Sequence, residues 1–126
     1  MTIGQLIKLL NKADLEHRVY FDFANCIPDS IASWRGIYAE PALGWCPSGY
    51  SASNTDRKNC TVGELLEMLN EALRETYIGW KGGEFQYNLD SPLHVDNNGD
   101  CTHTEISNVR ILRDWVILET SSSEYD

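Results

Sequence analysis

A twelve-residue pattern occurs twice in the chain and predicts two helices that begin in the same way. Residues 2–13 read TIGQLIKLLNKA and residues 61–72 read TVGELLEMLNEA. In each copy a threonine suited to the N-cap is followed three residues later by Gln5 or Glu64, which is the pattern of a capping box. Leucines then recur at helical spacing. We predict helices over about 2–13 and 61–75, and since the intervening segments do not match, two independent N-caps are favoured over a duplication.

Segments rich in β-branched and aromatic residues predict strands around these helices. The pair Asn98-Gly99 lies between two such segments and is typical of a hairpin. A turn is expected at residues 28–30, where Pro, Asp and Ser follow one another. The expected strands cover residues 18–23, 33–39, 43–45, 84–87, 93–95, 104–111 and 115–119.

The order of these segments predicts an α+β fold, an antiparallel β-sheet packed with two amphipathic helices. A chain of 126 residues is long enough for one compact core. We therefore expect a single ligand-binding domain over residues 1–120. The last residues, SSSEYD, predict a flexible C-terminal tail over 121–126.

The formal net charge of −9 argues against binding to polymeric nucleic acid, because such binding needs clustered lysine and arginine against phosphate. No apolar run approaches the length that spans a membrane. The N-terminus lacks the basic and apolar regions of a signal peptide. These features predict a cytoplasmic protein without a membrane partner, whose four cysteines are reduced.

Two metal sites are considered and neither is favoured. Asp96, Asn98 and Asp100 begin like a calcium loop, but the sixth and twelfth positions hold Cys101 and Ser107 instead of Gly and Glu. A plain turn is the better interpretation. 

His94, Cys101 and His103 are zinc-ligand types, yet the usual paired spacings of a zinc site are absent. The sequence thus predicts no metal and no cofactor.

Aromatic residues and arginines indicate a nucleotide as the ligand class. The segment SWRGIYAEPALGW holds Trp34, Arg35 and Trp45 beside glycines and a proline. An aromatic ring stacks a base, and a guanidinium group pairs with phosphate through its forked donors. Further arginines stand at positions 57, 110 and 113. The alternative is that the aromatics are core residues and the arginines balance an acidic surface, which the residues by themselves favour.

Three segments in order, SWRGIYAEPALGW, TVGELLEMLNEA and GWKGGEFQYNLDSPLHVDNNG, resemble the first-described class of phage Thoeris anti-defence proteins. The resemblance covers roughly residues 2–110. It implies a sponge that sequesters a cyclic ADP-ribose-type immune signal, a glycocyclic isomer, without cleaving it. It also implies a homodimer with ligand at the subunit junction, or a higher homo-oligomer that also binds cyclic oligonucleotides, in the cytoplasm of the host cell.

The resemblance also implies roles for individual residues. Phe85 in GGEF would stack on the base, and Arg110 or Arg113 would be the main cation for the phosphate. Arg57 would belong to a second site in higher assemblies, and Asn97 would line the pocket. 

Within SWRGIYAEPALGW, Trp34 and Arg35 are expected to face the ligand. The chain departs from the family pattern at His94 and Asp96, which bears on the identity of the ligand.

Two other functions remain open from the sequence. Glutamates at positions 64, 67, 71 and 75 follow one face of the second predicted helix, as in an acidic inhibitor that mimics nucleic acid, although a solvated helix face explains the same spacing. A cyclic-nucleotide hydrolase would use His94 or His103 as a general base and would show turnover.

Overall fold

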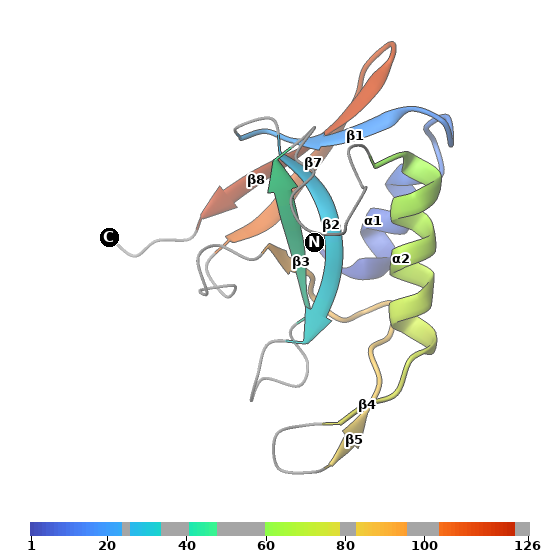
Figure 1. Ribbon diagram of the computed structural model, residues 1–126, viewed down its shortest axis with the longest axis vertical. Coiled ribbons are helices and arrows are strands. Elements are labelled where there is room, and N and C mark those ends of the chain that lie inside the picture. The colour runs from blue at the N-terminus through green and yellow to red at the C-terminus, as the bar shows by residue number, and fades with distance from the viewer. Residues whose placement is uncertain (24–25, 34–40, 48–59, 79–82, 96–103, 123–126) are drawn as a thin grey trace.

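Figure 1 shows the computed structural model of the protein, a strongly curved sheet with two helices packed against one side. The structure describes residues 1–23, 26–33, 41–47, 60–78, 83–95 and 104–122. In chain order the elements are α1 (Ile3–Leu10), β1 (Arg18–Phe21), β2 (Cys26–Ser33), β3 (Pro41–Pro47), α2 (Val62–Arg74), β4 (Tyr77–Ile78), β5 (Glu84–Phe85), β6 (His94–Val95), β7 (Thr104–Ile111) and β8 (Trp115–Ser122).

The α+β class is confirmed, but the main sheet is mixed and the prediction of an antiparallel sheet is wrong. Its strand order is β1-β8-β7-β6-β3-β2, and β4 pairs with β5 in a separate ribbon. Strands β1 and β8 are parallel, and so are β3 and β6. In each parallel pair, one strand comes after the helix of its own half, β1 after α1 and β6 after α2. Its partner, β8 or β3, comes from the other half of the chain. Pairings between segments so distant in sequence leave no turn signal between them.

Both predicted capping boxes are present. The N–H of Gln5 donates to Oγ1 of Thr2 at 3.1 Å, and the N–H of Thr2 donates to Oε1 of Gln5 at 2.8 Å. Thr61 and Glu64 make the same reciprocal pair at 3.1 and 2.9 Å. The two helices therefore begin where the sequence indicates, and end somewhat earlier than predicted.

The first turn of α1 is held by a turn that lies far away in sequence. The N–H of Ile3 donates to the carbonyl of Ser91 at 3.0 Å, and the N–H of Gly4 donates to the carbonyl of Leu89 at 2.9 Å. These bonds satisfy donors that a helix start leaves without an intrahelical partner.

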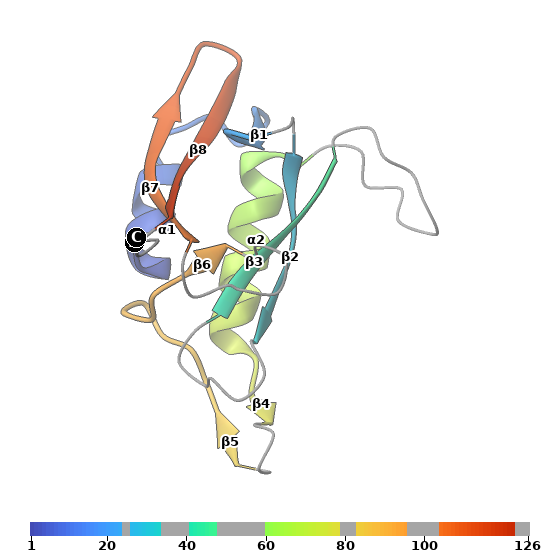
Figure 2. The same ribbon diagram turned by 90° about the vertical axis from the view of Figure 1, so that its left-hand side faces the viewer.

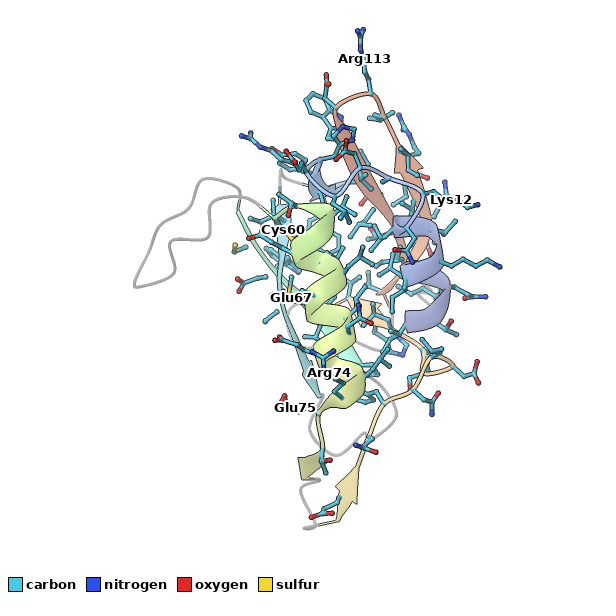
Figure 3. The ribbon with its side chains drawn as sticks, turned by 90° about the vertical axis from the view of Figure 1, so that its right-hand side faces the viewer. Lys12, Cys60, Glu67, Arg74, Glu75 and Arg113 are labelled. Carbon is cyan, nitrogen blue, oxygen red and sulfur yellow. The ribbon has the colours of Figure 1, made fainter. Side chains whose placement is uncertain are left out.

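The first turn of α2 is held in the same way by a turn from the N-terminal half. The N–H of Val62 donates to the carbonyl of His17 and that of Gly63 to the carbonyl of Leu15, both at 2.9 Å. Each half of the chain thus caps the helix of the other half. Figure 3 shows the helices side by side and antiparallel, with Lys12, just after the end of α1, and Cys60, at the start of α2, both toward the upper end of the helix pair.

The two capping turns are also built alike. Oδ1 of Asp14 accepts from the N–H of Glu16 at 2.9 Å, and Oδ1 of Asn88 accepts from the N–H of Asp90 at 2.8 Å. Such bonds are those of Asx turns. The sequences DLEH and NLDS are therefore structurally equivalent, although only their leucine is identical.

The strands repeat as well, because the hairpins β2–β3 and β7–β8 share their register. Each hairpin shifts register at one bulge, between Pro28 and Ser30 in β2 and between Ile106 and Asn108 in β7. The fold is therefore two interlocked units, each a helix followed by three strands of the main sheet, with the β4–β5 ribbon added in the second unit. The preference for two independent N-caps is wrong, because the twelve-residue pattern at residues 2–13 and 61–72 belongs to a structural repeat.

Replacing Gly4 by alanine is expected to destabilise the protein by about 1–3 kcal/mol. A Cβ at Gly4 would lie 2.9 Å from the carbonyl oxygen of Leu89, whereas one at Gly63 would lie 3.3 Å from that of Leu15. Urea unfolding of both variants measures the difference. Because alanine favours helices over glycine by about 1 kcal/mol, Gly63→Ala should lose far less stability than Gly4→Ala. Equal losses would contradict this account of the helix starts.

The core lies between the concave side of the sheet and the two helices. Alternate residues of β8, Val116 and Leu118, are fully buried, as are Leu6 and Leu65 on the helices. The stripes of leucines predicted from helical spacing thus supply the core face of each helix. Among the described residues, the others with no exposed surface are Ile3, Leu10, Val19, Ile27, Leu43, Cys60, Val62, Leu69 and Ile106.

The prediction of a turn at residues 28–30 is wrong. Strand β2 runs through residues 28–30, where a turn was predicted, and Pro28 sits at the β-bulge, a position where a sheet accepts proline. The strand predicted over 33–39 lies mostly outside the described residues. Strand β8 continues to Ser122, so residues 121 and 122 of the predicted tail belong to the sheet, and residues 123–126 lie outside the described residues. Within the described part of the chain, no helix combines the length and apolar character needed to cross a bilayer.

Candidate functional site

The strands β1, β8 and β7 expose one side of the sheet, which we call the outer face. Successive side chains of a strand point to opposite sides, so burial of Val116 and Leu118 directs Trp115, Ile117 and Glu119 outward. The register places Arg18 beside Trp115 and Tyr20 beside Ile117. The outer face consists of Arg18, Tyr20, Asn108, Arg110, Trp115, Ile117 and Glu119.

An aromatic pair lies on the outer face. Trp115 is 46% exposed, which is unusual for the largest apolar residue. The rings of Tyr20 and Trp115 meet edge to face, with centroids 6.4 Å apart and planes at 87°. This contact between neighbouring strands orients the indole while nearly half of the residue's surface stays in solvent.

A polar group adjoins the aromatic pair. Nη1 of Arg110 lies 3.5 Å from Oε2 of Glu119, and Nδ2 of Asn108 donates to Oε1 of the same carboxylate at 3.0 Å. The Arg110 side chain is 55% exposed, so this ion pair is largely screened by water. An anionic ligand that binds the Arg110 guanidinium group would therefore have to displace only a weakly held carboxylate, that of Glu119.

The predicted arginines Arg110 and Arg113 lie on the same hairpin. Arg110 is in β7, and Arg113 is an exposed residue in the turn between β7 and β8. Figure 3 shows Arg113 at the tip of that hairpin, pointing away from the rest of the molecule. The structure therefore places these two predicted site residues on one hairpin.

The third described site residue, Phe85, lies elsewhere. It is in β5, opposite Tyr77 of β4. Figure 2 shows the β4–β5 ribbon and the β7–β8 hairpin at opposite ends of the long axis, with α2 between them. The 13 residues of α2 span about 20 Å at the usual helical rise. Phe85 and Arg113 of one chain therefore lie too far apart to contact one small ligand together.

The other predicted site residues, Trp34, Arg35, Arg57 and Asn97, lie outside the described residues. Of the segment SWRGIYAEPALGW, the described part includes Trp45. Its ring packs edge to face against Phe23, with centroids 5.3 Å apart. The core interpretation of the aromatics thus holds for Trp45.

The alternatives from the sequence find only partial counterparts in the described residues. Glu64, Glu67, Glu71 and Glu75 are all exposed, and Glu64 closes the capping box of α2. Figure 3 shows Glu67 and Glu75 projecting from the helix. Among described residues, no group of three or more His, Cys, Asp or Glu side chains is placed to hold a metal ion. The segment 96–100, for which a plain turn was favoured over a calcium loop, and the pair Cys101 and His103 lie outside the described part.

Alkylation with iodoacetamide is expected to modify Cys46 before Cys26 and Cys60. Cys26 and Cys60 are at most 2% exposed, whereas Cys46 is half-buried. Burial also raises the pKa of the Cys26 thiol, which lowers the fraction of reactive thiolate at any pH below it. Peptide mass mapping after timed alkylation measures the order. Modification of Cys26 at the rate of Cys46 in folded protein would contradict the structure.

Sequence reasoning did not select Tyr20, Trp115 or Arg18. Their signal was present: in residues 115–119, WVILE, buried valine and leucine alternate with Trp115, Ile117 and Glu119. However, which of two alternating sets faces the core depends on where the helices pack.

Comparison of the chain with models of known protein families, with curated proteins and with solved structures gives no significant match.

Proposed function

We propose that the protein binds and sequesters a cyclic ADP-ribose-type signal without cleaving it, as an anti-defence sponge in the cytoplasm of an infected cell. The sequence resemblance names the ligand class. The observation that carries the proposal is the exposed position of Arg110 and Arg113 on one hairpin. Such groups bind the pyrophosphate of the signal through charge-assisted hydrogen bonds.

The separation of Phe85 from this hairpin supports a site shared between two copies of the chain. One copy supplies Phe85 from β5, and the other supplies Arg110 and Arg113 from the β7–β8 hairpin. In a symmetric dimer such an arrangement creates two identical sites. Two arguments therefore support a site at the subunit junction. The sequence resemblance implies it, and the distance between β5 and the β7–β8 hairpin within one chain requires two copies.

Sequestration requires affinity and no chemical step. Stacking on an aromatic ring contributes about 1–3 kcal/mol per base, and charge-assisted hydrogen bonds contribute about 1.5–3 kcal/mol each. A nanomolar dissociation constant corresponds to about −12 kcal/mol. Several contacts of these kinds reach that value once the cost of association is offset.

The test is to incubate the purified protein with the glycocyclic ADP-ribose isomer, remove free ligand, denature the protein by heat and identify what is released. Release of the intact isomer in stoichiometric amount is the expected result. Release of a cleaved product would replace the proposal by the hydrolase alternative. Absence of any bound nucleotide would overturn it, and the acidic-inhibitor alternative would then be tested with basic partner proteins at varied salt concentration.

A further inference from the structure

We propose that Trp115, oriented by Tyr20, stacks on the adenine base of the bound nucleotide, with Arg18 beside it. This inference rests on the proposed function and assigns a base-stacking surface that the sequence analysis did not contain. The ligand class is a small anionic adenine nucleotide.

The geometry of the aromatic pair fits this role. The edge-to-face contact at 6.4 Å and 87° fixes the ring orientation of Trp115 on the neighbouring strand. A ring that is already ordered loses little conformational entropy when a base stacks on it. Trp115 remains 46% exposed, so the surface is accessible in the single chain.

Charge complementarity selects an anionic partner for this surface. The described residues include six lysines and arginines, and three of them lie on or next to the outer face: Arg18, Arg110 and Arg113. Two carboxylates beside the outer face are already engaged, since Asp22 accepts two hydrogen bonds from Thr120 and Glu119 accepts one from Asn108. The exposed carboxylate of Asp114, next to Trp115 in the β7–β8 turn, offsets part of the positive charge. In a chain of net charge −9, three arginines around the exposed Trp115 favour an anion with a flat ring.

The structural repeat provides an internal control for this argument. In the other unit, Ala42 pairs with His94 and Ala32, just as Ile117 pairs with Tyr20 and Arg110. The equivalents of Ile117 and Arg110 are thus both alanine, and Ala42 is only 4% exposed.

The same backbone framework therefore forms without a large or charged side chain at these two positions. The demands of the fold do not explain why Ile117 and Arg110 stand on the outer face. A surface that binds a ligand does explain it.

The overall charge of the chain decides between two kinds of nucleotide ligand. Exposed aromatics on a sheet also stack the bases of single-stranded nucleic acid. Such binding neutralises several successive phosphates and needs an extended basic track. Three arginines in an acidic chain suit a ligand with only a few phosphates.

The experiment is titration calorimetry of the glycocyclic ADP-ribose isomer into four proteins: wild type, Trp115→Ala, Trp115→Phe and Leu15→Ala. We expect Trp115→Ala to weaken binding about ten-fold or more, and Trp115→Phe to stay within about three-fold because it keeps a stacking ring. Leu15 is 57% exposed and lies outside the surface, so Leu15→Ala serves as the matched control and should bind like wild type. Circular dichroism confirms that each variant is folded.

Wild-type affinity in folded Trp115→Ala would overturn the stacking assignment and leave the sponge function standing. If wild type binds no isomer, the sponge function fails separately, and the surface is then tested with ADP-ribose and with oligo-dT by tryptophan fluorescence. Quenching by ADP-ribose in wild type that is lost in Trp115→Phe supports the surface as a nucleotide site. Quenching by oligo-dT alone, or by neither probe, overturns it.

Discussion

A 1:1 mixture of Phe85→Ala and Arg110→Ala chains is expected to recover about a quarter of the ligand sites that wild type has, although each variant alone binds weakly. If each site is shared between two subunits, a homodimer of either variant lacks one needed residue at each of its two sites. A mixed dimer has one site with both substitutions and one with neither. Random exchange makes half of the dimers mixed, and calorimetric stoichiometry measures the intact sites.

Arg110→Ala alone should weaken binding by about ten-fold to a hundred-fold, because charge-assisted hydrogen bonds contribute about 1.5–3 kcal/mol each. The matched control is Glu119→Gln, which removes the carboxylate 3.5 Å from the Arg110 guanidinium and should bind at least as tightly as wild type. If subunits exchange but no tight site appears in the mixture, Phe85 and Arg110 do not form a shared site. Arg110→Ala with wild-type affinity would remove this arginine from the site altogether.

Leu6→Ala and Leu65→Ala should each lower the free energy of unfolding by about 2–5 kcal/mol, and by similar amounts. Both side chains are fully buried, and both follow their N-cap threonine at the same spacing in the repeat. Each substitution leaves a cavity where a helix packs against the sheet. Urea unfolding followed by circular dichroism measures the loss.

Glu67→Ala is the control for α2, since Glu67 is exposed and should change stability by less than about 0.5 kcal/mol. A loss in only one of the two leucine variants would show that the units are not energetically equivalent. It would contradict the interpretation of the helices as matching parts of one interlocked core.

The helix starts were predictable because they depend on neighbours in sequence. A capping box needs only a threonine and a Gln or Glu three residues later. The pairs Thr2 with Gln5 and Thr61 with Glu64 can therefore be recognised from the sequence alone. The hairpin of β6 and β7 was likewise indicated by Asn98-Gly99 between two strand-forming segments, and the pairing of His94 with Glu105 confirms it.

The candidate site was predictable only in part. Arg110 and Arg113 lie three residues apart, and the sequence resemblance marked both. That Phe85 lies at the other end of the molecule follows from the packing of α2 and the β4–β5 ribbon, which no local pattern contains. Trp115 and Tyr20 were missed because they become neighbours only through the parallel pairing of β1 with β8.

The sequence by itself determined the helix starts, the leucine faces and the α+β class, because each rests on residues within a few positions of one another. Only the tertiary structure decided that the two helices are capped by each other's turns, that β1 and β6 enter the sheet in parallel, and which side of β8 meets solvent. These features depend on contacts such as Gly4 with Leu89 and Val19 with Val116. Contacts of this range arise from burying both leucine faces in one core, and that packing has no short-range signature.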